Sequence, residues 1–205
     1  MDLPKIEDLA SCGDEEYLEA LARLLNRAGF GFSGVFVGDL TPKEAVIIGK
    51  RKGPHGVTRL AACGDPYSAL RYAQFVDRGP RDDTRLAACE TTYYAYQYAR
   101  YVDKDPREDT RQVACGHPHY AYRYAWDVDE GPREDTRQAA CGDPEHAYRY
   151  ARDVDEGSRE DTRQAACGDP EWAYRYAREV DKGFHEETWA SVQGTYWEKF
   201  YPVAE

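Results

Sequence analysis

The sequence predicts an all-α fold, a right-handed α-solenoid of stacked two-helix repeats with degenerate capping repeats at both ends. Three observations predict it. The phrase Thr-Arg-x-Ala/Val-Ala-Cys returns every 26 residues, each copy carries start and stop signals for two short helices, and an alanine–tyrosine stripe recurs on the second helix. Five cysteines mark the phrase: Cys63, Cys89, Cys115, Cys141 and Cys167.

The first helix of a repeat is short and rich in small residues. In the best-preserved copy, residues 158–183, we expect it over residues 160–167. Gly168 follows, and glycine adopts the left-handed conformation that ends many helices at little cost. The sequence therefore predicts that Gly168 ends this helix in that conformation.

The second helix begins at a strong capping signal. The Asp169 carboxylate can accept the free backbone amides of a helix N-terminus, Pro170 suits the first helical position, and Glu171 adds negative charge where the helix dipole favours it. We expect this helix to end near Asp181, because Gly183 follows and prolines stand just beyond it in other copies.

A stripe of alternating small and large side chains follows the second helix. Ala173, Tyr176, Ala177 and Val180 are spaced so that they lie on one side, together with Trp172. The alanines let a neighbouring helix approach to roughly 8–10 Å, and the tyrosine ring fills the remaining space. Neither helix can bury such a stripe alone, so the repeats must stack.

The whole chain, residues 1–205, is predicted to form a single solenoid domain. Residues 1–37 form a degenerate N-terminal capping repeat and loop, and residues 38–57 a second degenerate repeat. Residues 58–183 are the regular repeats. Residues 184–205 replace the pattern with aromatic side chains, which predicts a C-terminal cap over the last repeat.

Composition predicts a cytoplasmic protein without a cofactor. The chain has a net charge of −11, a mean hydropathy of −0.83, and neither a membrane segment nor a basic, apolar signal sequence at its start. Cysteines of stacked copies should stand about 8–10 Å apart, beyond the roughly 7 Å limit for a disulfide, so we expect reduced thiols that act as packing residues. His117 and His119 are the one local cluster with ligand chemistry, but other repeats carry Asp, Tyr or Glu in those columns, and we predict no metal.

The charge is unevenly spread, which bears on the kind of partner. Residues 1–27 contribute −4 and residues 184–205 contribute −3, so the long middle of the chain is nearly balanced. Within it, Glu171 and Arg175, and Arg175 and Glu179, have the spacing of exposed helical ion pairs. One arginine column, from Arg59 to Arg163, is expected to bond to the aspartates that end the second helices. A mixed-charge surface of this kind disfavours nucleic acid as the partner.

The function predicted from these features is a non-enzymatic scaffold that binds a protein partner. No nucleophile stands out beside a base, whereas tyrosine and arginine, the pair enriched at binding hot spots, recur one position outside the core stripe. The residues of this repeated Tyr/Arg face are Tyr96, Tyr122, Tyr148, Tyr174, Arg123, Arg149 and Arg175. The competing interpretation is that these rings only fill the second side of a helix packed between neighbours.

Two other functions remain open. Aromatic ends could join copies of the chain end to end into dimers or filaments. The residues of that surface are Phe30, Phe32, Phe36, Trp189, Trp197, Phe200 and Tyr201. The acidic chain could also act as a decoy for a nucleic-acid-binding or defence protein, although the balanced charge of the middle repeats counts against this.

Short units of a small-residue helix, a Gly-Asp-Pro turn and a second helix resemble the helical-repeat solenoids of the HEAT-like and leucine-rich-variant kind. That resemblance implies a binding scaffold. Some leucine-rich-variant proteins carry an iron–sulfur cysteine cluster, but the first fifty residues here hold only Cys12, so no cofactor is implied. The phrase Asp-Thr-Arg-x-Ala-Ala-Cys is also similar to repeats of uncharacterised bacterial and phage proteins, and near-identical copies indicate recent duplication or consensus engineering.

Overall fold

The structure is a computed structural model that describes residues 40–202. The chain divides into two compact units, unit 1 ending at Asp103 and unit 2 beginning at Lys104. Every regular element in the described range is helical. The predicted N-terminal cap, with Phe30, Phe32 and Phe36, lies outside the described residues. None of the described helices is long and apolar enough to cross a membrane.

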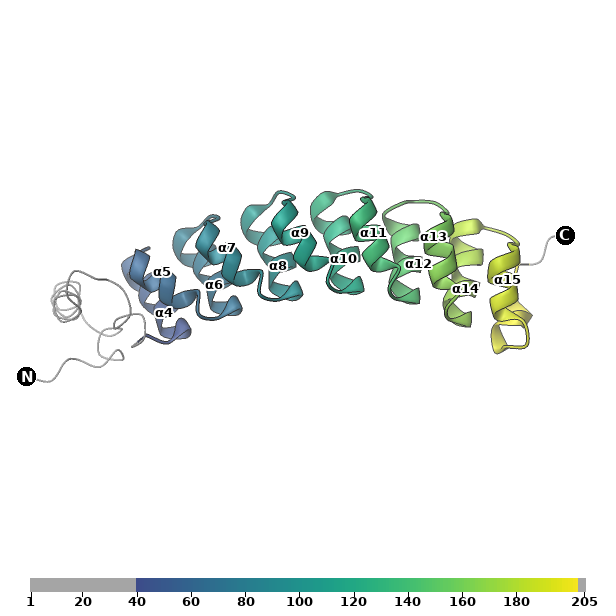
Figure 1. Ribbon diagram of the computed structural model, residues 1–205, viewed down its shortest axis with the longest axis horizontal. Helices are drawn as coiled ribbons and strands as arrows, with labels where there is room; N and C mark the ends of the chain where they lie inside the picture. Colours follow the sequence, from purple (N-terminus) through teal and green to yellow (C-terminus); the bar gives the residue numbers. More distant parts are fainter. Residues whose placement is uncertain (1–39, 203–205) are drawn as a thin grey trace, which may run out of the picture. The chain divides into compact units, whose positions relative to one another are not determined.

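Unit 1 is a row of short helices in which each second helix lies beside the next (Figure 1). α4 is the second helix of the predicted degenerate repeat, and α6 and α8 each continue into a wider π-helical turn. α4 packs along α5, and α6 packs along α7. The elements are α4 (Pro42–Lys52), α5 (Gly56–Ala62), α6 (Pro66–Tyr72), η1 (Ala73–Asp77), α7 (Asp82–Ala88), α8 (Thr92–Tyr98) and η2 (Ala99–Asp103).

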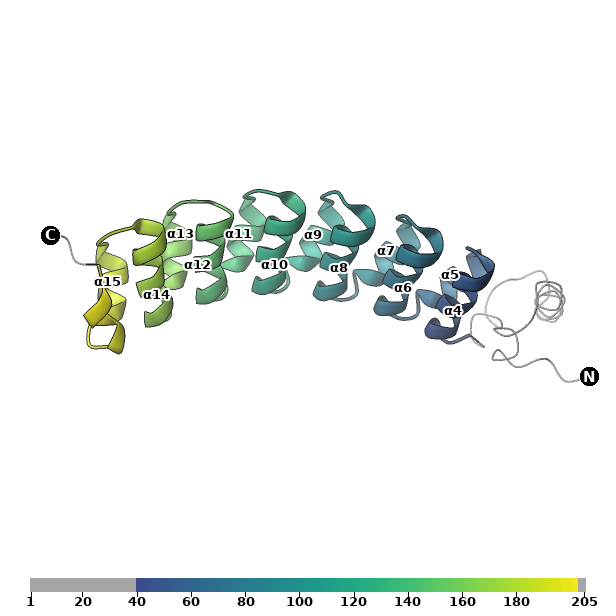
Figure 2. The same cartoon turned by 180° about the vertical axis from the view of Figure 1, so that it is seen from behind.

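Unit 2 repeats this arrangement, with α10, α12 and α14 side by side (Figures 1 and 2). Its elements are α9 (Glu108–Ala114), α10 (Pro118–Tyr124), η3 (Ala125–Asp129), α11 (Glu134–Ala140), α12 (Pro144–Asp153), α13 (Glu160–Ala166), α14 (Pro170–Tyr176), η4 (Ala177–Asp181), α15 (Glu186–Val192) and the 3₁₀ turn η5 (Tyr196–Phe200). Within each unit, the predicted fold class of stacked two-helix repeats is confirmed.

Most of the predicted helix signals act as expected, but the glycine after the first helix has a different role. Asp169 caps α14, and its carboxylate accepts from the backbone amide of Glu171 at 2.8 Å. The predicted left-handed conformation of Gly168 is wrong, because only Gly53 and Gly194 have a positive φ among the described glycines. A Cβ at Gly168 would lie 3.2 Å from both the Ala165 carbonyl oxygen of the same repeat and Pro144 Cγ of the preceding repeat, so close packing favours glycine there, although the equivalent position of one repeat is Glu90.

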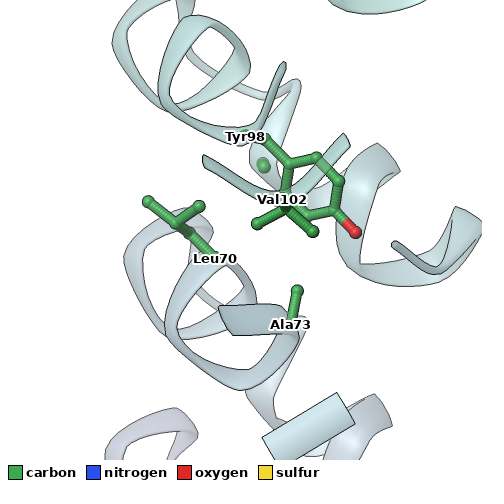
Figure 3. Close-up of a cluster of buried hydrophobic side chains, with 5 residues drawn as sticks. Leu70, Ala73, Tyr98 and Val102 are labelled. Atoms are coloured by element: carbon green, nitrogen blue, oxygen red, sulfur yellow. The ribbon is translucent and has the colours of Figure 1, made fainter. Parts of the chain in front are cut away.

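The alanine–tyrosine stripe forms the core, as predicted. Figure 3 shows one cluster, in which Leu70 and Ala73 of one repeat face Tyr98 and Val102 of the next, with Ala88 beside them. Within a unit, a second helix therefore buries its stripe against both helices of the following repeat. Burying a tyrosine-sized side chain contributes on the order of 2 kcal/mol, so these contacts are the main source of stability between repeats.

A buried hydrogen-bond latch holds the two helices of each described repeat from α5 onward together. The Tyr150 hydroxyl accepts from the Arg133 backbone N–H at 2.9 Å and lies 2.9 Å from the Thr136 hydroxyl and 3.0 Å from the Arg133 carbonyl oxygen. The same latch recurs with Tyr72, Tyr98, Tyr124 and Tyr176, and Tyr201 repeats it in the C-terminal cap through Thr188 at 2.6 Å. The threonine column is therefore the partner of the core tyrosines.

The predicted arginine–aspartate ladder is present, and most of its bonds lie inside one repeat. Arg85 donates to Asp103, eighteen residues later, at 2.8 Å, and Arg137 lies 3.4 Å from Asp155. A second carboxylate connects adjacent repeats, as between Arg137 and Asp161 at 2.9 Å. The ladder therefore fixes the geometry of each repeat and reinforces its contact with the next.

The cysteine column lies within the electrostatic influence of this ladder. Cys63, Cys89, Cys115, Cys141 and Cys167 are free thiols of intermediate exposure. Burial raises the pKa of Cys63, Cys115 and Cys141 to about 12, so their thiols stay protonated at neutral pH.

Candidate protein-binding face

The tyrosines of the predicted Tyr/Arg face are buried. Tyr96, Tyr122, Tyr148 and Tyr174 expose between 1% and 7% of their surface. Their hydroxyls bond to polar groups at the rim, such as Asp153 at 2.9 Å from Tyr122 and Arg178 at 2.9 Å from Tyr174. Burial, followed by the bond to Asp153, raises the pKa of Tyr122 to about 12. This is the packing arrangement that the sequence left open, and it leaves the rings little surface for a partner.

The arginines of the same face are half-buried and ion-paired. Arg149 lies 2.5 Å from Glu145, and Arg175 lies 2.7 Å from Glu171, each pair four residues apart along one helix. Arg123 forms the equivalent pair with Asp127 at 2.7 Å. The predicted pair between Glu171 and Arg175 is therefore present, whereas Glu179 bonds to Arg178 instead of Arg175.

The residues predicted for self-assembly differ in exposure within the described part of the chain. Tyr201 is buried in its latch, and Trp189 and Trp197 pack against the last core cluster. Trp197 stacks on the Tyr174 ring, with centroids 5.2 Å apart. Phe200 alone of these four is exposed. The cap therefore uses three of its six aromatic side chains, Trp189, Trp197 and Tyr201, to close the last repeat, and leaves Phe184, Tyr196 and Phe200 exposed.

Unit 1 presents a set of exposed aromatic side chains that the sequence analysis did not single out. Tyr67, Phe75, Tyr93 and Tyr101 expose 42% to 46% of their surface. Tyr67, Tyr93 and Tyr101 border a groove of about 330 Å³ between the second helices of two adjacent repeats, and the Phe75 ring contacts Arg71, which also lines the groove. The groove is lined by Tyr67, Leu70, Arg71, Gln74, Tyr93, Tyr94, Gln97 and Tyr101.

The same repeat positions in unit 2 carry mostly charged side chains. Tyr67 and Tyr93 correspond to His119, Glu145 and Glu171. Phe75 and Tyr101 correspond to the acidic residues Asp127, Asp153 and Glu179. Aligning the repeats and comparing the residues at each equivalent position would have revealed this contrast between the units without the structure.

Arg71 occupies in unit 1 the position that Arg123, Arg149 and Arg175 occupy in unit 2, but its neighbours differ from theirs. In unit 2 the residues four positions before or after this arginine supply its carboxylate, but Tyr67 and Phe75 occupy both places around Arg71. Its guanidinium carbon lies 4.1 Å from the centroid of the Phe75 ring and 5.9 Å from that of Tyr67. Within residues 40–202, no carboxylate lies at ion-pair distance from Arg71. Its hydrogen-bond donors are available beside the groove.

The two units also differ in charge. Residues 40–103 hold ten lysines and arginines against seven aspartates and glutamates, a net charge of +3. Residues 104–202 hold fourteen against twenty-two, a net charge of −8. The aromatic groove therefore lies on the basic part of an acidic chain.

Histidines from two adjacent repeats meet in unit 2. His119 Nδ1 lies 3.0 Å from His146 Nε2, and His146 Nδ1 lies 2.6 Å from Asp143 Oδ1. Burial, the neighbouring histidines and nearby arginines lower the pKa of His119, and the bond to His146 helps to lower the pKa of Asp143. His117 instead caps α10 through its ring. No group of three metal-ligating side chains is found in the described range.

Fold and surface together define a helical-repeat protein with an exposed aromatic groove on one unit. Comparison with protein-family models, curated proteins and solved structures finds no match to this chain.

Proposed function

We propose that this protein is a non-enzymatic helical-repeat scaffold that binds a protein partner through the second helices of unit 1. The observation that carries the proposal is the aromatic groove, where Tyr67, Tyr93 and Tyr101 are exposed, as is Phe75 beside Arg71, at positions that are mostly charged in unit 2. Exposed apolar side chains gathered at one place are typical of protein interaction sites. Tyrosine and arginine, which line this groove, are enriched at binding hot spots.

The repeated Tyr/Arg face of the sequence analysis keeps a supporting part in this proposal. Its tyrosines pack the second helices together, and its three arginines, all in unit 2, form ion pairs within their own helices. Reduced thiols with raised pKa values accord with a cytoplasmic location, which we include in the proposal.

The test is partner capture by the native chain and by a variant that gives unit 1 the chemistry of unit 2. The double substitution Tyr67→Glu and Phe75→Asp places carboxylates four residues before and after Arg71, as Glu145 and Asp127 stand beside their arginines. Unit 2 tolerates acidic side chains at both positions, so we expect the variant to fold. Native protein immobilised on beads should retain a partner from an extract of the source cells, and the variant should lose it. Equal capture by both proteins would contradict the proposal.

A matched control separates the groove from exposed aromatic side chains in general. Tyr196→Glu changes a tyrosine that is more exposed than those of the groove but lies in the C-terminal cap. Capture should be unchanged in this variant. A loss as large as that of the groove variant would assign binding to hydrophobic exposure alone.

Self-assembly is the second candidate, and one observation favours it. Phe184, Tyr196 and Phe200 expose about half or more of their surface at the C-terminal end of unit 2. Sedimentation velocity across a hundredfold range of concentration tests it. Growth of the mass with concentration, abolished by Phe200→Ser, would support end-to-end assembly, and a constant monomer mass would refute it.

A further inference from the structure

The groove carries an inference about the chemistry of its partner, which rests on the proposed function. A guanidinium stacked on aromatic rings keeps its N–H donors in the plane of the group, pointing away from the rings. Arg71 has this arrangement over Phe75 and Tyr67. A planar carboxylate is the group that such a fork of donors binds best in a polypeptide, through two parallel hydrogen bonds.

The surroundings of Arg71 favour an anion and supply no competing one. Lys50 lies 4.6 Å from the centroid of the same Phe75 ring, which adds a second cation beside the guanidinium. The described part of unit 1 has a net charge of +3. An acidic ligand would therefore gain from the local charge of Arg71 and Lys50, whereas a basic ligand would be repelled.

The rest of the groove fits an apolar side chain on an extended chain. Tyr67, Tyr93 and Tyr94 form a connected aromatic wall, with ring centroids 6.1 Å apart between Tyr67 and Tyr94 and 4.9 Å apart between Tyr93 and Tyr94. Gln74 and Gln97 place amide groups in the same groove. Amides can donate to and accept from a peptide backbone, and tyrosine rings provide rigid contact area for an aliphatic side chain.

We propose that this groove binds a linear acidic segment of a protein partner. An aspartate or glutamate carboxylate of the segment bonds to Arg71, and an aliphatic side chain next to it packs between the tyrosines. In unit 2 this carboxylate is supplied within the chain, by Glu145 for Arg149 and Glu171 for Arg175. The partner therefore completes in unit 1 an ion pair that unit 2 completes by itself.

The first experiment selects ligands from a phage-displayed library of random 12-residue peptides. The native chain is the target, and binders of the Tyr67→Glu, Phe75→Asp variant are removed in a subtraction step. We expect enriched sequences that combine Asp or Glu with a neighbouring Leu, Ile, Val or Pro. Enrichment of basic sequences, or no enrichment over the subtracted variant, would overturn the proposal.

The second experiment measures the affinity of one enriched synthetic peptide by fluorescence anisotropy. Arg71→Gln should weaken binding about tenfold, which is about 1.4 kcal/mol, and replacing the acidic residues of the peptide by lysine should weaken it at least as much. Arg175→Gln, in the same column of unit 2, is the matched control and should leave the affinity unchanged. Equal affinity of native and Arg71→Gln proteins would overturn the role of the carboxylate, as would tighter binding of a labelled oligothymidine.

These outcomes separate the inference from the function on which it rests. One outcome is that the groove variant loses partner capture while Arg71→Gln leaves peptide affinity unchanged. This outcome would preserve the protein-binding function and refute the acidic ligand. Capture that is unchanged in the groove variant would refute both.

Discussion

The tyrosine latch makes a quantitative prediction about stability. Tyr150→Phe removes one hydroxyl and leaves the ring, so the core packing in unit 2 is preserved. That hydroxyl is bonded to Thr136 and to the N–H and C=O groups of Arg133, at 2.9 to 3.0 Å. Two net hydrogen bonds at about 1 kcal/mol each give an expected loss of about 2 kcal/mol in the free energy of unfolding of unit 2.

The assay is urea unfolding followed by far-ultraviolet circular dichroism, with hydrogen exchange as a local measurement. The backbone amide of Arg133 should exchange faster in the variant, because it has lost its acceptor. Tyr148→Phe is the matched control: its hydroxyl bonds to the partly exposed side chains of Glu179 and Arg152, which water can replace, so we expect a loss of about 0.5 kcal/mol.

Thr136→Val tests whether the latch acts as a unit. The two substitutions remove opposite partners of one hydrogen bond, so their effects should fall short of additive by about 1 kcal/mol. A loss below about 0.5 kcal/mol for Tyr150→Phe, or strictly additive effects, would refute the latch as a source of stability.

Three further predictions concern the ladder, the histidines and the cysteines. Arg85→Met should destabilise unit 1 by about 3 kcal/mol, because it leaves the buried Asp103 carboxylate unpaired. Asp82→Ser changes a side chain that is 99% exposed and should cost less than about 0.5 kcal/mol. Urea unfolding measures both effects. Because the pKa of His119 is lowered in the folded protein, the unfolded chain binds protons more readily. The stability contributed by neutral His119 is therefore complete above the unfolded value near pH 6.5 and is lost as the pH falls toward the folded value. His119→Gln should flatten the pH dependence of the free energy of unfolding between pH 7 and 5. Cys63, with a pKa raised to about 12, should react with iodoacetamide at pH 8 more than tenfold slower in the native protein than in urea, as measured by peptide-resolved mass spectrometry.

The sequence predicted the repeat, the helix positions and the core because each rests on a local signal. A period of 26 residues, an aspartate–proline start such as Asp169-Pro170 and an alanine–tyrosine stripe act within one or two turns of helix. The role of Gly168 was mispredicted for the opposite reason. Its constraint is shared between Ala165 and Pro144, one repeat away, and contacts across repeats depend on the small rotation between them.

The candidate site shows the same division. The Tyr122 column seemed suited to binding because tyrosine and arginine are adjacent in sequence, but its burial is decided by how the second helices pack side by side. The groove of unit 1 was not predicted because its residues are not shared by the repeats, and the prediction rested on shared positions. Tyr67 and Phe75 are informative because acidic side chains occupy most of the equivalent positions in unit 2. Their effect is visible only in the structure, where Arg71 lies over the Phe75 and Tyr67 rings.

The central claim, that the groove of unit 1 contacts a protein partner, is tested most directly by site-specific photo-crosslinking. The photoreactive phenylalanine analogue p-benzoylphenylalanine replaces Tyr93 in the groove and, in a second variant, Glu171 at the equivalent position of unit 2. Irradiation in an extract of the source cells should yield a crosslinked partner from position 93 and none from position 171. Crosslinks of equal yield from both positions, or from position 171 alone, would contradict the account.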